Sequence, residues 1–163
     1  MSYVIDLLNQ HDYPIEATAL EAAANAVLKR HDVLPETVIT IAFLNDEEIQ
    51  ALNLRHRGVD KATDVLSFPA DALPDEIEES PYLGDILIAY PYTLAQSEQE
   101  GYSMADSLVL MVVHGTLHLL GYDHDTNENH AEMWELQAEV LTELGINPDI
   151  VPAYEQDHDE PMD

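Results

Sequence analysis

Two spacings of apolar residues recur along the chain, and they predict its secondary structure. Runs rich in β-branched and other apolar residues predict strands over residues 3–8, 37–44, 63–68 and 83–90. Apolar residues that recur every three or four positions predict helices over residues 14–31 and 128–144. An N-cap at Asn45 or Asp46 with acids in the first turn predicts a helix over 46–55, and further helices are expected over 91–100, ending at Gly101, and 103–120. The fourth helix, capped by Ser103 or Asp106, is apolar nearly all round, so we expect it to be the central buried helix.

The order of these elements favours an α+β fold rather than a regular doubly wound sheet. We expect a single domain over residues 1–150, with a small, mixed, four-stranded sheet packed against helices and a zincin-like metal-binding helix. Residues 70–81 are acidic and contain proline, which predicts a surface loop. Residues 151–163 form an acidic tail that we expect to be disordered.

The charge balance narrows the possible partners. The chain has 163 residues, with five Lys and Arg against 33 Asp and Glu, for a formal net charge of −28. Such a field repels nucleic acid at long range and disfavours membrane binding, so we expect no DNA or membrane partner, and any RNA contact must be local and positive. Residues 1–10 lack a secretory pattern, and the longest apolar run, residues 108–120, is shorter than the about 20 residues of a membrane span. We therefore expect a cytoplasmic protein.

The stretch HGTLHLLGYDH, residues 114–124, predicts a metal site. His114 and His118 are four residues apart and share one face of a helix, and Gly121 lets the chain reverse so that His124 can return. This spacing matches the metzincin pattern except at Gly115, where that pattern has glutamate. The alternative is three separate core histidines, but buried imidazoles without partners are costly, so the spacing favours a metal. Because the chain has no cysteine, the ligands must be nitrogen or oxygen.

Gly115 argues against peptide hydrolysis because the protease glutamate is the general base. Three neutral imidazoles would leave the full charge on the ion, favour an anionic substrate and keep a fourth coordination position open, as in catalytic sites. Asp123 could orient a ligand or assist proton transfer, or it could be a turn residue. His130 could be a fourth ligand, but we favour an exposed helix residue.

Three of the five basic residues lie close together: Arg55, Arg57 and Lys61. Salt bridges to the abundant acids would explain Arg55 and Lys61, which are also candidates for RNA contacts. Arg57 directly precedes Gly58, which predicts a functional loop that leads to a strand. Since arginine suits phosphate through its planar fork, Arg57 near a metal would indicate a phosphodiesterase.

The stretch at 114–124 resembles the signature of the YbeY family, metal-dependent endoribonucleases also called rRNA maturation factors. The resemblance extends to LNLRHRGVDKATDVLSFP, LGDILIAY and MWELQAEVL, and so covers most of residues 38–144. It implies a one-domain α+β fold and one zinc ion held by His114, His118 and His124. It also implies hydrolysis of single-stranded RNA, with Arg57 as a catalytic residue. The implied role is ribosomal RNA processing, mainly at the small-subunit RNA end, and ribosome quality control.

Two other functions stay open at this point. One is a ribosome-associated assembly or binding factor whose metal is structural, in which Arg57 would be dispensable. The other is a metallopeptidase, which the histidine spacing suggests and Gly115 opposes.

Overall fold

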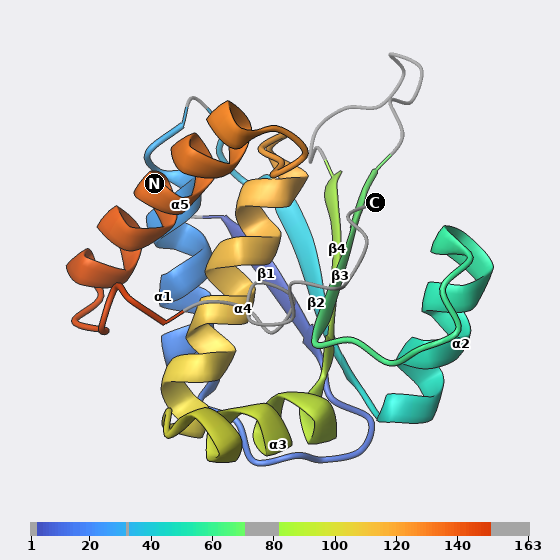
Figure 1. Ribbon diagram of the computed structural model, residues 1–163. Coiled ribbons are helices and arrows are strands. Elements are labelled where there is room, and N and C mark those ends of the chain that lie inside the picture. The colour runs from blue at the N-terminus through green and yellow to red at the C-terminus, as the bar shows by residue number, and fades with distance from the viewer. Residues whose placement is uncertain (1–2, 32, 71–81, 151–163) are drawn as a thin grey trace.

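The computed structural model describes residues 3–31, 33–70 and 82–150 and has the predicted α+β architecture (Figure 1). The tail at 151–163 and all but the first residue of the acidic loop at 70–81 lie outside the described residues. The elements follow one another as β1 (Val4–Leu8), α1 (Ala17–Leu28), β2 (Val38–Leu44), α2 (Asp46–Arg57), β3 (Val65–Pro69), β4 (Tyr82–Ala89), α3 (Tyr90–Glu100), α4 (Met104–Leu119) and α5 (Asn127–Glu143).

The four strands form one mixed sheet in the order β1-β2-β4-β3. Strands β1, β2 and β4 are parallel, and β3 runs antiparallel to β4 at the edge. The alternation of side chains explains why β2 is a central strand: Ile39, Ile41 and Phe43 point to the same face of the sheet and are completely buried there. Pro69 is the last residue of β3, one position beyond the predicted strand, which an edge strand tolerates because part of its backbone is unpaired.

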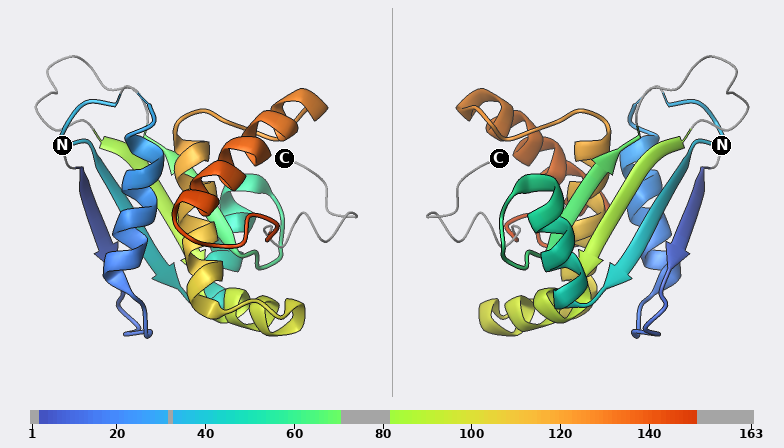
Figure 2. Two further views of the ribbon diagram at one scale, coloured as in Figure 1. Left: turned by 90° about the vertical axis from the view of Figure 1, so that its left-hand side faces the viewer. Right: turned by 90° about the vertical axis from the view of Figure 1, so that its right-hand side faces the viewer.

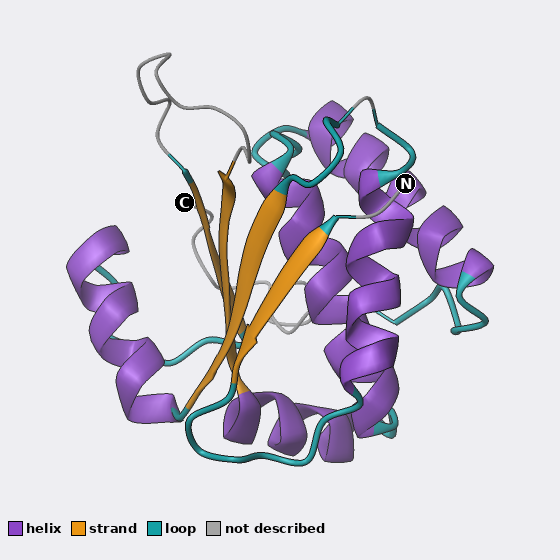
Figure 3. Ribbon diagram, turned by 180° about the vertical axis from the view of Figure 1, so that it is seen from behind, coloured by secondary structure: helices purple, strands orange, loops and turns teal. Residues whose placement is uncertain are grey.

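The helices are distributed unequally over the two faces of the sheet (Figures 2 and 3). Helices α1 and α4 pack on one face with α5 outside them, whereas α2 lies on the opposite face. The central helix is α4, as predicted, with every residue from 107 to 117 buried. The main core therefore lies between α4 and the sheet, and it holds the C-terminal half of α4 in place.

Capping residues set where several helices begin. Asn45 is the N-cap of α2 and forms a capping box with Glu48, and Ser103 caps α4 by accepting the backbone N–H of Asp106. Helix α1 is shorter than predicted at both ends, since it begins at Ala17 and ends at Leu28. No helix within the described residues is long and apolar enough to cross a membrane.

Candidate metal centre

Two of the three histidines point from the same face of α4. The ring centroids of His114 and His118 are 4.6 Å apart, and their Nε2 atoms approach to 3.1 Å. His114 is only 2% exposed because it lies where α4 passes between the sheet and α5. The helical spacing in the sequence thus brings two imidazole nitrogens to one point.

The turn after α4 brings His124 back to this pair. Gly121 has φ 103°, in the left-handed region that favours glycine, and its N–H donates to the carbonyl of His118 at 3.0 Å. The His124 ring centroid then lies 4.9 Å from that of His118 and 5.9 Å from that of His114. One ligand atom from each histidine lies within 4.8 Å of the others, so the group could hold a metal ion.

Hydrogen bonds at the far side of two rings determine which nitrogens face the site. The Oε1 of Gln137 lies 2.9 Å from Nδ1 of His114, and the carbonyl oxygen of Tyr122 lies 3.0 Å from Nδ1 of His118. Both oxygens accept, so both Nδ1 atoms carry the proton and donate. In the neutral rings each Nε2 therefore presents a lone pair toward the other, an arrangement that a cation between them relieves.

Burial also favours the neutral form that a metal ligand requires. Burial, followed by the neighbouring His118, lowers the pKa of His114 well below its usual range. Burial is also the largest cause of the lowered pKa values of His118 and His124. Because a protonated imidazole cannot coordinate, these shifts keep the nitrogens available near neutral pH. Three nitrogen donors with no thiolate fit Zn²⁺ in a three-histidine site.

Two residues around the histidines were missed by the sequence reasoning. Gln137 is 1% exposed on α5 and accepts the hydrogen bond from His114, and the edge of the His114 ring meets Trp134 at a centroid distance of 5.5 Å. A signal for Gln137 exists: it is a polar residue on the inner face of α5, between buried Met133 and Val140. Polar residues on such a face need a buried partner, which here is His114.

Replacing Gln137 by leucine is expected to weaken zinc binding about 10- to 100-fold, because His114 loses the acceptor that fixes its tautomer. Competition with a chromogenic chelator would measure this change. Gln137→Glu keeps an acceptor at the same place and serves as the control, with tight binding retained. Equal zinc affinity of Gln137→Leu and the unaltered protein would show that the hydrogen bond has no orienting role.

Gly115 lies against the sheet rather than in an open site. A Cβ atom added there would lie 2.8 Å from Cγ2 of Ile86 on β4, and the hydroxyl of Ser67 on β3 lies 3.5 Å from the Gly115 carbonyl oxygen. Close packing explains the glycine physically, because α4 can approach the sheet this closely only without a side chain. A glutamate at this position would have to displace Ile86, so the peptidase base is excluded by packing as well as by sequence.

Gly115→Ala is expected to destabilise the protein by about 1–2 kcal/mol, since overpacking costs more than the helix propensity that alanine gains. Denaturant unfolding would measure the loss. Combining it with Ile86→Ala should relieve the contact and give a coupling of about 0.5–3 kcal/mol in a double-mutant cycle. Additive effects of the two substitutions would contradict the proposed contact.

Arg57 lies at the end of a helix, so its prediction as a loop residue was wrong. Helix α2 continues two residues beyond its predicted end, to Arg57, and Gly58 closes it with φ 73° in the left-handed region. The backbone of Gly58 and Val59 satisfies the last carbonyls of the helix, which explains the longer element. Burial is the main cause of the lowered pKa of His118, and the positive charge of the exposed Arg57 adds to it, so the guanidinium lies within electrostatic range of that ring.

The other basic residues separate into two groups. Lys29 and Arg30, at the end of α1, form ion pairs with glutamates of α5 at 2.7–3.3 Å. Arg55 is exposed on α2, and Lys61 is exposed in the segment that leads to β3, where its carbonyl accepts from Asn53 at 2.9 Å. The side of the molecule that carries α2 therefore holds three of the five basic residues.

Asp123 and His130 flank the three histidines. One carboxylate oxygen of Asp123 accepts the backbone N–H of His124 at 2.8 Å, as a turn residue does. Burial lowers the pKa values of His118 and His124, and the charge of Asp123 offsets part of that lowering. His130 is half-buried rather than exposed, because its ring stacks on Trp134 at a centroid distance of 4.1 Å. Among the described residues, the metal-binding group comprises His114, His118 and His124 and does not include His130.

Comparisons with known proteins agree with this geometry. The family model described as Endoribonuclease YbeY matches residues 7–145. A protein of that name from Chloroflexus aggregans is 39% identical over 151 residues, covering 90% of this chain and 99% of the relative. One from Bartonella quintana is 41% identical over 137 residues, covering 83% and 84%. The solution structure of TM1509 from Thermotoga maritima matches with a TM-score of 0.57 and 25% identity, covering 86% of this chain and 89% of that one.

Proposed function

Because this chain belongs to the YbeY family of endoribonucleases, we propose that it is a zinc-dependent, single-strand-specific endoribonuclease of ribosomal RNA maturation. Its proposed tasks are processing of the small-subunit RNA end and ribosome quality control, in the cytoplasm. One observation carries the proposal: three imidazole nitrogens converge, and no carboxylate among the described residues joins them. A site of this kind leaves a bound cation's charge available to an anionic phosphodiester.

His114, His118 and His124 would hold the metal, and Gln137 and the Tyr122 carbonyl would orient two of these rings. A bound Zn²⁺ would supply a Lewis acid that polarises the phosphodiester and acidifies a water molecule. The protein supplies neutral ligands at neutral pH through burial of the rings. It also supplies a fixed geometry, because α4 and α5 are both anchored in the core.

Arg57 is proposed to bind the phosphodiester and to stabilise the negative charge that develops on it. The supporting observation is that its charge acts on His118, although the two residues belong to helices on opposite faces of the sheet. A guanidinium can donate two parallel hydrogen bonds to phosphate oxygens. Arg55 and Lys61 are proposed to contact the RNA backbone farther along the strand.

The net charge of −28 bears on the kind of RNA that can bind. A duplex has a higher density of phosphates than a single strand, so it meets stronger repulsion from the acidic surface. A single strand meets weaker repulsion on its way to the exposed basic side chains of Arg55, Arg57 and Lys61. Repulsion of this kind is weaker at higher salt, where charges are screened over about 8–10 Å.

The test uses one end-labelled RNA sequence, prepared both as a single strand and as a duplex. Each form is incubated with the zinc-loaded protein in about 0.15 M salt, and its cleavage is measured. We expect internal cuts in the single strand and little cleavage of the duplex. A chelator should stop the cleavage of either form. A ribosomal RNA precursor with an unprocessed small-subunit end should be shortened. Cleavage that survives chelation in an RNase-free preparation would contradict the zinc mechanism, and cleavage of casein would favour a metallopeptidase.

A further inference from the structure

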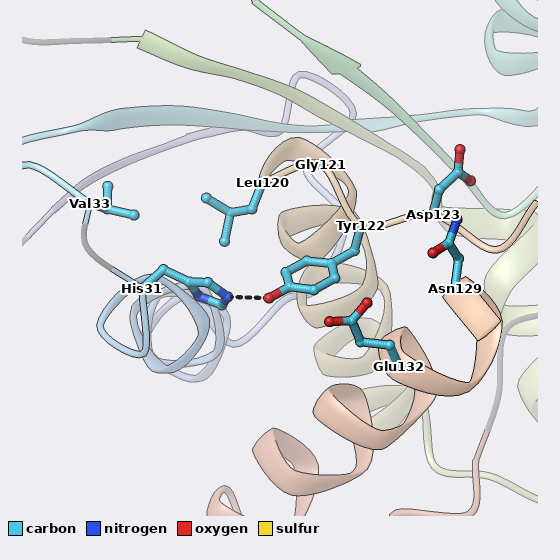
Figure 4. A pocket seen from close by; sticks show the side chains of 8 residues that line it. All are labelled: His31, Val33, Leu120, Gly121, Tyr122, Asp123, Asn129 and Glu132. Atoms are coloured by element: carbon cyan, nitrogen blue, oxygen red, sulfur yellow. Dashed lines mark hydrogen bonds between the residues drawn. The ribbon is translucent and has the colours of Figure 1, made fainter.

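A cavity of about 420 Å³ lies beside the loop that links His118 to His124 (Figure 4). Its volume is typical of a small-molecule site. Three segments contribute its lining: the segment after α1, the loop after α4, and the start of α5. The residues are His31, Val33, Leu120, Gly121, Tyr122, Asp123, Asn129 and Glu132. Tyr122 connects this cavity to the metal centre, because its backbone carbonyl holds His118 while its side chain lines the cavity.

One part of the lining is apolar and aromatic. Val33 and Leu120 contribute aliphatic side chains, and the ring of Tyr122 meets His31 edge-on at a centroid distance of 5.5 Å. Figure 4 shows the hydrogen bond that joins these two rings. The ring of Tyr122 alone forms the flat part of this aromatic wall, because the His31 ring is inclined at 66° to it, and the face of such a ring accepts a planar ring of a ligand.

The polar part of the lining presents hydrogen-bond acceptors. Nδ1 of His31 donates to the carbonyl of Val27 at 2.9 Å, and Nε2 accepts from the Tyr122 hydroxyl at 3.0 Å. Both ring nitrogens are therefore occupied, and the acceptor that remains for a ligand is the hydroxyl oxygen of Tyr122. The side-chain amide of Asn129 donates to Asp125 at 2.8 Å, which leaves its carbonyl oxygen as an acceptor.

The carboxylates add more acceptors. The carboxylate of Glu132 makes no hydrogen bond or ion pair with another residue in the described part of the chain, and Asp123 uses one oxygen for the backbone of His124. Asp123, Asn129 and Glu132 are exposed, and their acceptors favour a ligand that donates hydrogen bonds.

Several ligands are disfavoured by this lining. Phosphate is repelled by the carboxylates of Asp123 and Glu132. A second metal ion lacks the ligands it needs, because among the described residues only the three histidines bring at least three metal-binding side chains together. A planar molecule whose edge carries N–H groups satisfies both the aromatic wall and the acceptors.

We infer that this cavity binds one unpaired base of the RNA strand next to the cleaved phosphodiester, and that it selects guanine. Guanine carries adjacent N1–H and N2–H₂ donors, which match the two oxygens of one carboxylate, that of Glu132. Uracil presents a single N–H between two carbonyl oxygens, which face repulsion from the same carboxylate. This inference rests on the proposed endoribonuclease function and adds a base preference to it.

The first test uses nucleosides and does not depend on cleavage. Guanosine, inosine and uridine would be titrated into the zinc-loaded full chain, with binding followed by NMR signals of Tyr122 and His31. We expect guanosine to bind at least about 10-fold more tightly than inosine, which lacks the 2-amino group, and than uridine. Glu132→Gln should remove this preference, whereas Glu135→Gln, the same change at an exposed position of α5 outside the cavity lining, should keep it.

The second test measures cleavage of uridine oligomers that carry one guanine at successive positions. We expect one position of the guanine relative to the cut to raise kcat/KM about 10-fold over the guanine-free oligomer. Glu132→Gln should remove this ratio, whereas Glu135→Gln, outside the cavity lining, should keep it. Two results would overturn the base site and leave the endoribonuclease proposal standing. One is normal RNA cleavage together with equal binding of the three nucleosides. The other is displacement of guanosine by spermidine together with cleavage that shows no base preference. Absence of any RNA cleavage would instead overturn the proposed function.

Discussion

Replacing His114 by alanine is expected to remove bound zinc and to reduce RNA cleavage by at least about 1,000-fold, to the background of the assay. His114 is the most buried of the three candidate ligands, and its Nε2 lies 3.1 Å from that of His118. Two remaining imidazoles bind zinc much more weakly than three, so both readouts should fall together. Metal analysis of the purified protein and cleavage of a labelled single-stranded RNA would measure them.

The matched control is His130→Ala, which removes another histidine close to the site. His130 stacks on Trp134 and stands outside the group of three, so this variant should retain zinc. His114→Gln adds a check on folding, because glutamine fills more of the buried space than alanine. The metal assignment would be refuted if well-folded His114→Gln held one equivalent of zinc and cut RNA normally.

Replacing Arg57 by alanine is expected to lower kcat about 100- to 1,000-fold while zinc content and stability stay unchanged. Arg57 is exposed and ends α2, so little packing is lost, whereas its charge acts on His118. Steady-state cleavage, metal analysis and thermal unfolding of the same preparation would separate these effects. Arg57→Lys keeps the charge but lacks the planar guanidinium, so its kcat should lie between that of the unaltered protein and that of Arg57→Ala.

Arg55→Ala is the comparison that gives this test its specificity. It removes the same charge from an exposed position of the same helix, and we expect it to weaken RNA binding mainly through KM. If Arg57→Ala cleaved RNA as well as the unaltered protein, Arg57 would have no catalytic role. If, in addition, the protein unfolded when zinc was removed, the site would fit a structural metal in a ribosome assembly factor.

Local sequence patterns were sufficient to predict a structural feature wherever the interaction that forms it lies within a short segment of the chain. The pairing of His114 with His118 depends only on the helical repeat, and the return of His124 depends on a glycine at position 121. The cap of α2 at Asn45 depends on residues three positions apart. The pairing of the histidines and the return of His124 were predicted because the residues that make each one are close in sequence, and so was the cap of α4 at Ser103.

The residues that surround the three histidines could not be predicted from local sequence patterns. Gln137 reaches His114 across 23 positions of the chain, and Ile86 fills the space beside Gly115 from a strand of the sheet. The end of α2 was also misjudged, because favourable closure by Gly58 allowed two more helical residues. Contacts between segments distant in sequence depend on how elements pack, which periodicity does not report.

By itself, the sequence determined the fold class, the order of the elements and the identity of the three histidines, because these follow from spacing along single segments. Only the tertiary structure decided which imidazole nitrogens face one another, why position 115 admits no side chain, and where a cavity lined by acceptors lies beside the histidines. Each of these depends on α1, α4, α5 and the sheet meeting at fixed distances. Close packing of the core sets those distances, and it arises only when the whole chain has folded.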